Sequence, residues 1–332
     1  MKLATLKDGS RDGLLAVVSR DLTQAHFAAG IASRMQQLLD DWNFISPQLE
    51  DLYATLNGGK ARHAFAFDPR HCMAPLPRAY QWAEASAYPT HARRLRGASG
   101  TDPAAQEADA PRLEQGSGDH FLGPCDDAVF AEASSRIDFG AGLAVITGDV
   151  PMGATPEAAL DGVRLLMLVN GWRLRGKEPA GGTESGGAAQ NRPAPAFSPV
   201  AVTPDELGGA WRGGRVHLEI ESVWNGQRLG RCSAGESMGA HFGELIAQLA
   251  AAREVRAGSI VGSGTVSHAD SALGCHCAAE KAALDAPAAQ EARGEVVRSA
   301  TWPGLGDLIR IEMLCADGTS LYGAIEQRLR AR

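Results

Sequence analysis

The segment from residue 137 to residue 149, IDFGAGLAVITGD, constrains the fold of this chain more than any other. We expect it to form a strand, in which alternate residues face the same side. Gly140 and Gly142 then share one face and leave it without side chains. Glycine loses more conformational freedom on folding than any other residue, so this pair costs strand stability. It predicts either a bend in the strand or the close approach of another backbone.

The part of the chain that follows alternates short strands with short helices. Thr155 and Pro156 are typical of the start of a helix, which Gly162 ends. The run over residues 163–169, apolar except at residue 164, is typical of a buried strand. The remaining elements expected here are strands around Val200, over residues 216–220 and over residues 309–314, and a helix over residues 241–253.

The N-terminal part is predicted to be a small α/β unit. Residues 14–19 form an apolar run suited to a short strand. Apolar residues at helical spacing predict a helix over residues 22–42. A second helix is expected to begin with Ser46 as N-cap and Pro47 at its first position, and to end at residues 57–59, Asn-Gly-Gly.

Punctuation by proline and glycine suggests the domain organisation. The run Leu-Pro-Arg after Pro75 is expected to separate a small N-terminal α/β domain, residues 1–75, from a larger C-terminal domain, residues 76–332. Residues 97–118 and 176–190 have little apolar periodicity and are expected to form long loops that would shape any pocket.

Composition excludes several classes of function. The net charge of −7 argues against a phosphate-binding surface, so we expect no nucleic-acid partner. No apolar run is long enough to span a membrane, and the N-terminus lacks a secretory segment, so we expect a cytoplasmic protein with no membrane partner. The triplet Cys275-His276-Cys277 lacks the second ligand pair of a structural zinc site, which disfavours zinc there.

Several separate motifs together resemble the fumarylacetoacetate hydrolase superfamily. In the family the strand described first has the sequence Phe-Glu-Ala-Glu-Leu, where this chain has Phe-Gly-Ala-Gly-Leu. Each motif alone is weak, but they occur in the order of the family and cover nearly the whole chain. The others are LPRAYQWA (76–83), FLGP (121–124), AFSPVAVTPDELG (196–208), GSGTV (262–266) and GD (306–307) before the strand at 309–314.

The resemblance implies a fold, a reaction and a cofactor. The fold would be α+β and mostly β, a mixed β-roll with a smaller N-terminal α/β domain. Family members hydrolyse a carbon–carbon bond beside a diketone, or decarboxylate or hydrate related keto acids, which suggests a role in aromatic amino acid catabolism. A Mg²⁺ or Ca²⁺ ion acts as Lewis acid for the enolate that leaves. Homodimers are common in the family, so we expect a homodimer here.

The positions of the family's metal ligands are poorly filled. By the resemblance, Glu84 occupies the first ligand position, and Gly140, Gly142 and Gly171 occupy the other three. A hard divalent ion needs anionic oxygens, so we expect Mg²⁺ or Ca²⁺ to bind weakly or not at all. The alternative for Gly171 is an ordinary Asn-Gly turn. Rescue ligands from Asn170 or Asp138 lie outside the family positions.

The other roles implied by the resemblance are filled more completely. His91 and Glu280 match the histidine and glutamate that activate water, and Arg175 and Thr265 match residues that contact the substrate. Arg192 stands where the family has a lysine near the substrate carbonyl. Without the resemblance, His91 would be a surface histidine, and Arg175 and Glu280 would be solvated surface charges.

Two functions of different classes follow. The first is a hydrolase of the fumarylacetoacetate type that acts on a small β-diketo or keto acid, with activity impaired by the loss of metal ligands. The second is a metal-free pseudo-enzyme that binds an anionic metabolite or a protein partner through Arg175, Arg192 and Thr265.

Overall fold

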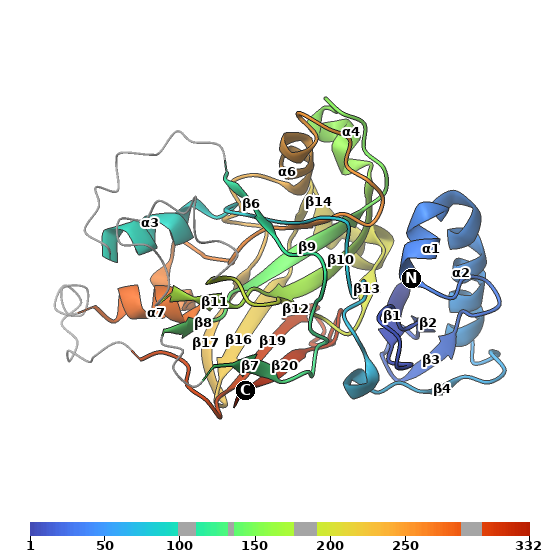
Figure 1. Cartoon of the computed structure of the whole chain (residues 1–332), viewed down its shortest axis with the longest axis horizontal. Coiled ribbons are helices and arrows are strands. Elements are labelled where there is room, and N and C mark those ends of the chain that lie inside the picture. Colours follow the sequence, from blue (N-terminus) through green and yellow to red (C-terminus); the bar gives the residue numbers. More distant parts are fainter. Residues whose placement is uncertain (99–110, 132–135, 176–190, 287–300) are drawn as a thin grey trace.

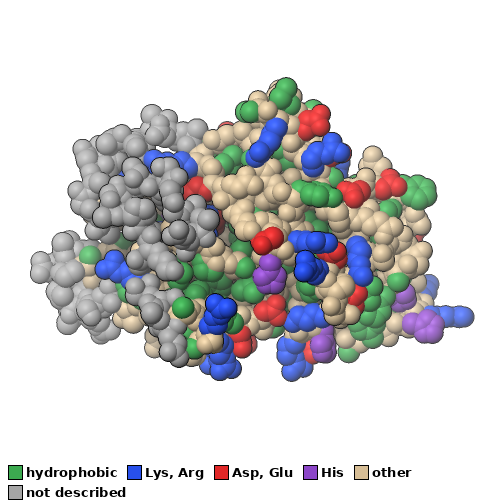
Figure 2. All heavy atoms as spheres, in the orientation of Figure 1, with side chains coloured by type: hydrophobic (Ala, Val, Ile, Leu, Met, Phe, Trp, Pro, Cys, Tyr) green, Lys and Arg blue, Asp and Glu red, His purple; other side chains and the backbone are tan. Residues whose placement is uncertain are grey.

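A computed structural model describes residues 1–98, 111–131, 136–175, 191–286 and 301–332 (Figure 1). Strands predominate over helices, so the predicted fold class, α+β and mostly β, is confirmed. Figure 2 shows basic, acidic and histidine side chains interspersed on the face that it presents. Within the described residues, no helix has the length and apolar character needed to cross a lipid bilayer.

One large sheet runs from the N-terminal unit, at the right of Figure 1, into the centre of the molecule. Its strands follow one another in the order β4 (Phe65–Ala66), β3 (Gln24–Phe27), β2 (Leu14–Val18), β1 (Lys2–Leu6), β13 (Ala201–Val202), β10 (Val163–Asn170), β9 (Ala141–Thr147), β18 (Ile260–Gly262), β5 (Trp82–Ala85) and β6 (Leu113–Gly116), with β12 (Ala196–Phe197) paired to β10. Because β1 pairs with β13, the two parts of the chain share this sheet.

A second sheet and two short ribbons complete the β-structure. The second sheet has the order β17 (Gln227–Ser233), β16 (Glu219–Trp224), β19 (Leu308–Leu314), β20 (Ile325–Ala331) and β7 (Ala128–Phe130). The ribbons pair β8 (Ile137–Asp138) with β11 (Arg173–Leu174), and β14 (Trp211–Arg212) with β15 (Arg215–Val216).

Helices cover the sheets in pairs. The described helices are α1 (Met35–Asp40), α2 (Trp42–Asn57), α3 (Pro89–Ala98), α4 (Pro156–Leu160), α6 (Phe242–Leu249) and α7 (Ala278–Leu284), with 3₁₀ turns η1 (Pro69–His71), η4 (Pro204–Ala210) and η5 (Ser271–Leu273). Figure 1 places α1 and α2 beside the N-terminal strands, and α3 packs on α7 at the opposite end.

Both faces of β10 are buried over most of its length, which explains the continuous apolar run from Leu165 to Val169. Leu166 and Leu168 point into the core that includes the second sheet, whereas Leu165 and Met167 point into the core that includes α1 and α2. All four side chains are fully buried. A strand covered on both faces needs apolar residues at every position, so the alternation of a half-exposed strand is absent.

Several sequence predictions are confirmed. The strand predicted over residues 14–19 is β2, and the buried strand predicted over residues 163–169 is β10. The Thr155 side chain accepts a hydrogen bond from the Ala158 amide at the start of α4, as an N-cap does. The predicted helix over residues 241–253 is α6, for which His241 is the N-cap.

Two predictions in the N-terminal part are wrong. Residues 24–27 form β3, which pairs with β2, so the helix expected over residues 22–42 is confined to α1 at its end. Sheet pairing therefore overrides the helical spacing of the apolar residues. Ser46 and Pro47 do not start a helix, because α2 begins at Trp42 and contains Pro47 inside it. Its end at Asn57, with Gly58 as C-cap, is as predicted.

The expected loop over residues 97–118 is also partly wrong. Residues 113–116 form β6, which pairs with β5 at the edge of the large sheet. Residues 99–110, and the loop expected over residues 176–190, lie outside the described residues. The predicted domain boundary at residue 75 remains a prediction.

A buried polar contact links the second sheet to the segment before α7. His276 is 1% exposed, and its Nδ1 atom lies 2.9 Å from the Ser222 hydroxyl of β16. Its Nε2 atom lies 3.2 Å from the Cys232 sulfur of β17. Burial lowers the pKa of His276 to about 4, so the ring is neutral at pH 7. The triplet at residues 275–277 thus contributes His276 to the core.

We predict that His276 makes the stability depend on pH. Its pKa is lower in the folded chain than in the unfolded chain, so the unfolded chain binds more protons between pH 6.5 and about 4. Stability should fall as the pH drops through this window, by up to about 3 kcal/mol. Urea unfolding at several pH values would measure the slope. The slope should be smaller in His276→Asn and unchanged in His63→Asn, where the histidine is exposed. Equal slopes in both variants would contradict the prediction.

Candidate active site

A cluster of two carboxylates and two guanidinium groups lies where β5 and β6 pair. Glu84 of β5 and Glu114 of β6 are directly opposite each other in the antiparallel register. Arg173 of β11 places Nη2 3.0 Å from Glu84 Oε2, and Arg192 places Nη1 2.8 Å from the same oxygen. We call these four residues the arginine–carboxylate cluster.

Both arginines also face the second carboxylate. Arg173 Nη2 lies 3.6 Å from Glu114 Oε2, and Arg192 forms an ion pair with the same oxygen. Carboxylates directly opposite each other repel, and the two guanidinium groups offset that repulsion. Burial would raise the pKa of the Glu84 carboxyl, but Arg173 and Arg192 outweigh it and hold that pKa below its ordinary value. Glu84 is therefore ionised at pH 7.

The three glycines predicted at ligand positions lie close to this cluster and to the loop after β18. A Cβ added at Gly171 would lie 2.8 Å from Glu84 Oε1. A Cβ at Gly140 would lie 2.6 Å from the Thr265 hydroxyl, and one at Gly142 would lie 2.4 Å from the Gly264 carbonyl oxygen. Gly140 and Gly142 thus face the same loop, as their spacing predicted, and another backbone does approach Gly142 closely.

Asn170 and Asp138, the two rescue ligands considered from the sequence, have other partners. Asn170 Oδ1 accepts a hydrogen bond of 3.2 Å from the Gly140 amide. Asp138 Oδ1 accepts a hydrogen bond of 2.7 Å from the Ala278 amide at the start of α7, and Asp138 Oδ2 lies 3.0 Å from Arg175 Nε. Both side chains are fully buried and take part in structural contacts.

His91 and Glu280 meet in a second cluster, formed by α3 and α7. His91 Nδ1 lies 3.1 Å from Glu280 Oε2. The other oxygen, Oε1, accepts a hydrogen bond of 2.7 Å from the Ser267 hydroxyl and an ion pair from Arg94. The Glu280 side chain is 0% exposed and that of His91 is 16% exposed. Reading either residue as a solvated surface group is therefore wrong.

These contacts decide the charge of Glu280. Burial would raise the pKa of its carboxyl, but the hydrogen bonds from His91, Arg94 and Ser267 outweigh burial and lower that pKa. An ionised carboxylate beside one ring nitrogen fixes the orientation of the histidine. Such a pair can hold the imidazole for proton transfer at its other nitrogen.

The segment from Gly262 to Ser267 runs from one cluster to the other, because Gly262 pairs with Glu84 across β18 and β5. Thr265 lies beside Gly140, and Ser267, two residues later, contacts Glu280. Gly140 in turn forms an isolated β-bridge with Cys277, just before α7. Arg175 is paired with Asp138, and its side chain is only 12% exposed, so reading it as a solvated charge is also wrong.

Sequence reasoning missed four members of the two clusters: Glu114, Arg173, Arg94 and Ser267. Arg173 could have been found from the sequence, because it lies two residues after Gly171 and would share its face on a strand. Arg94 lies three residues after His91 on a helix, which brings their side chains together. Nothing in the sequence indicated Glu114, because residues 97–118 were expected to form a loop.

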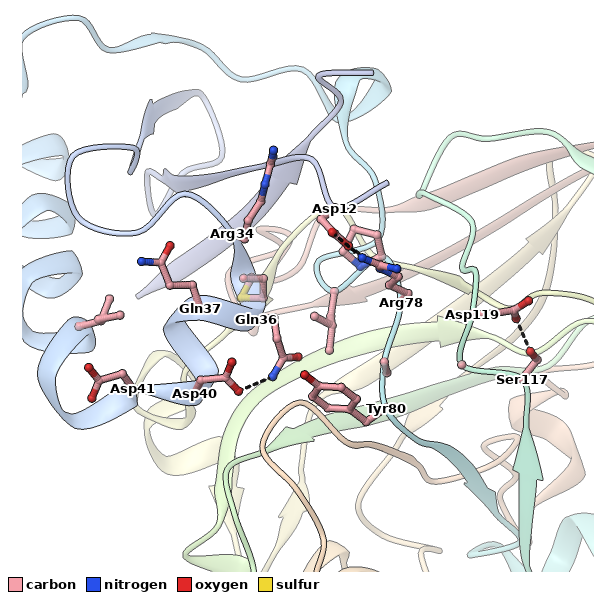
Figure 3. Close-up of a pocket in the computed structure, with 16 residues that line it drawn as sticks. Asp12, Arg34, Gln36, Gln37, Asp40, Asp41, Arg78, Tyr80, Ser117 and Asp119 are labelled. Atoms are coloured by element: carbon pink, nitrogen blue, oxygen red, sulfur yellow. Dashed lines mark hydrogen bonds and ion pairs between the residues drawn. The ribbon is translucent and has the colours of Figure 1, made fainter. Parts of the chain in front are cut away.

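A cavity of about 910 Å³ lies elsewhere, between α1 and the segment that precedes β5 (Figure 3). Several polar residues of its lining bind one another, such as Arg78 with Asp12 and Gln36 with Asp40. Tyr80 projects into the space between these groups. Neither cluster contributes to its lining, so this cavity is separate from the candidate active site.

Comparison with known proteins identifies the family. Residues 1–78 match the family model described as fumarylacetoacetase N-terminal domain 2, and residues 81–328 match the model described as fumarylacetoacetate (FAA) hydrolase C-terminal. A search of the curated proteins finds no match to this sequence.

Solved structures share the fold across the whole chain. A fumarylacetoacetate hydrolase from Exiguobacterium antarcticum is 15% identical, with a TM-score of 0.66 and 100% of each chain covered. A maleylpyruvate hydrolase from Sphingobium sp. SYK-6, solved with manganese(II) and pyruvate, is 16% identical, with a TM-score of 0.65 and coverage of 100% and 99%. A 2-hydroxyhepta-2,4-diene-1,7-dioate isomerase from Mycobacterium marinum is 12% identical, with a TM-score of 0.60 and the same coverage.

The neighbours therefore include both hydrolases and isomerases, and at these identities they establish the fold alone. The family models cover nearly all of the sequence. This chain belongs to the fumarylacetoacetate hydrolase family.

Proposed function

We propose that this protein binds a small keto or β-diketo acid at the arginine–carboxylate cluster without a resident Mg²⁺ or Ca²⁺ ion. One observation carries the proposal. Glu84, which occupies the first ligand position by resemblance, is held by Arg173 and Arg192 at 3.0 and 2.8 Å. Two guanidinium groups thus stand beside the carboxylate that would otherwise hold the cation.

The residues at the family positions do not fit a hard divalent ion. Mg²⁺ demands several oxygen ligands in a fixed array, and Ca²⁺ demands even more. Gly140, Gly142 and Gly171 supply no side-chain oxygen, and Glu84 already accepts from two arginines. The positive charge of those arginines would also repel a cation. No step of the proposed chemistry passes through a metal at this position.

Guanidinium groups suit a carboxylate ligand. Their planar fork matches the two oxygens of a carboxylate, and charge-assisted hydrogen bonds are about twice as strong as neutral ones. Arg192 replaces the lysine of the family near the substrate carbonyl, and Thr265 beside Gly140 adds a hydroxyl that is half-buried. The Sphingobium neighbour binds pyruvate, a keto acid, which supports the same class of ligand here.

The His91–Glu280 pair supports hydrolysis as the reaction. In such a reaction His91 would take a proton from water, and the water oxygen would attack a carbonyl carbon of the β-diketo acid. The carbon–carbon bond then breaks, and its electron pair forms an enolate, which takes the proton back from His91 to give a keto product beside the new carboxylic acid. Arg173 and Arg192 are the neighbouring cations that could stabilise this enolate, but a guanidinium group is not a Lewis acid, so we expect slow turnover.

The second candidate is a pseudo-enzyme that binds the same anion without reacting. The ion pairs of Glu84 with Arg173 and Arg192 support it equally. The two candidates differ only in whether the bound acid is hydrolysed. The division of the chain at residue 75, the homodimer and the cytoplasmic location also remain predictions.

Binding should occur without divalent ions. In EDTA, calorimetry with pyruvate and with an acylpyruvate should detect saturable binding to the full-length protein. We expect Arg192→Ala to weaken it at least about tenfold, because one charged hydrogen bond is worth about 1.5–3 kcal/mol. Arg192→Lys should lose less, since it keeps the charge but not the fork. Arg256→Ala, at an exposed site, is the matched control. The proposal would be refuted if binding required Mg²⁺, or if both Arg192 variants bound the keto acid with the affinity of the wild type.

Turnover should depend on His91. Hydrolysis of an acylpyruvate, followed by loss of its diketone absorbance, should fall by about 10²–10⁴ in His91→Asn, because general base catalysis contributes about this factor. Pyruvate binding should remain, since the cluster that binds it is intact. His71→Asn, at an exposed position, should behave as the wild type. If the wild-type protein binds acylpyruvate but does not hydrolyse it, the pseudo-enzyme is the correct function.

A further inference from the structure

We propose that His91, Cys277 and Glu280 form a binding site for a thiophilic divalent ion such as Zn²⁺ or Co²⁺. One ligand atom of each residue lies within 4.8 Å of the others. His91 comes from α3, Cys277 immediately precedes α7, and Glu280 lies in the first turn of α7. The packing of α3 on α7 therefore assembles the three ligands from two separate parts of the chain.

The ligand set determines the kind of ion. Sulfur, imidazole nitrogen and one carboxylate oxygen suit zinc and cobalt, whereas Mg²⁺ and Ca²⁺ prefer oxygen alone. Ligands of one tetrahedral zinc ion lie roughly 3.5 Å apart, given metal–ligand distances of about 2.0–2.3 Å. His91 Nδ1 and Glu280 Oε2 are already 3.1 Å apart, and no separation in the group exceeds 4.8 Å, so only small side-chain movements are needed. His91 is the partly exposed member of the group, so it is the side chain with room to move and the side from which an ion can enter.

The contacts of Glu280 leave one of its oxygens for a divalent ion. Arg94 and Ser267 contact Oε1, whereas Oε2 has His91 as its partner. The ion would displace the thiol proton of Cys277 to solvent and bind the thiolate. The Glu280 amide already donates to the Cys277 sulfur at 3.2 Å, which would stabilise the thiolate.

This site shares no residue with the ligand positions that the family resemblance assigns. It lies next to them, because Cys277 pairs with Gly140 across an isolated β-bridge. An ion bound by both His91 and Glu280 would remove that pair from acid–base chemistry. Three protein ligands leave a fourth position open for water or a substrate oxygen, as in catalytic zinc sites. A protein that holds an ion at this site therefore cannot use His91 and Glu280 as the base for hydrolysis.

Cobalt tests the proposal directly. Full-length protein, treated with chelator and dialysed, would be titrated with Co²⁺ in the absence of any keto acid. We expect one ion per chain, visible d–d bands of a four-coordinate ion and a near-ultraviolet charge-transfer band from thiolate to cobalt. Zn²⁺ should displace the cobalt and abolish both, and excess Mg²⁺ should not.

Three variants locate the ligands. Cys277→Ser should lose the charge-transfer band, and it should still fold because serine is a favourable N-cap for α7. Cys275→Ser, at a buried position in the same loop, is the matched control and should keep the band. His91→Asn should keep the thiolate band but bind Co²⁺ at least about 100-fold more weakly, beyond the loss typical of an outer-shell partner. Absence of the band in the wild type, or its persistence in Cys277→Ser, would overturn the proposal. Neither result bears on keto-acid binding.

Discussion

Two guanidinium groups hold two facing carboxylates, and the candidate active site depends on this balance of charge. Glu84 and Glu114 lie opposite each other at the edge of the large sheet, where like charges would repel. Arg173 and Arg192 come from segments more than 50 residues away along the chain and bind both carboxylates. The cluster thus joins β5 and β6 to the ribbon of β8 and β11. A bound cation could supply the same charge, but Gly140, Gly142 and Gly171 would offer it no side-chain oxygen.

The three glycines allow the site to close around this cluster. The backbone of Gly171 approaches Glu84, and the loop after β18 approaches Gly140 and Gly142. Larger side chains at these positions would force the loop or Glu84 to move, since added Cβ atoms would lie 2.4–2.8 Å from existing atoms. The absence of side-chain oxygens at these positions and the tight approach of the neighbouring groups are therefore two consequences of the same residues. Restoring carboxylates would require that the loop at residues 263–265 retreat.

The sequence predicted the central strands well because their signals are local. Residues 165–169 are apolar throughout, a pattern typical of a strand covered on both faces. The N-terminal helix was wrongly extended because helical spacing over residues 22–42 says nothing about pairing with β2. Pro47 was misplaced because a helix that packs on a sheet can retain an internal proline. Long-range pairing decided both cases.

Contacts between distant segments also determined how much of the site the sequence could predict. Family motifs brought Glu84, His91 and Glu280 into view, but the ion pairs that define their charge come from Arg173 and Arg94. Neither arginine stands at a motif position that the sequence marks as functional. Glu114 became visible only through the pairing of β5 with β6. Charge compensation between distant segments is a property of the fold, and no local pattern encodes it.

The affinity of the purified protein for Mg²⁺ and Ca²⁺ tests the central claim most directly. Calorimetric titration of chelator-treated protein, with metal analysis of the untreated sample, measures it without any assumption about substrate. If Arg173 and Arg192 supply the positive charge beside Glu84, neither ion should show saturable binding at millimolar concentration. A magnesium or calcium ion that copurifies with the protein and is lost in Glu84→Gln would contradict the account.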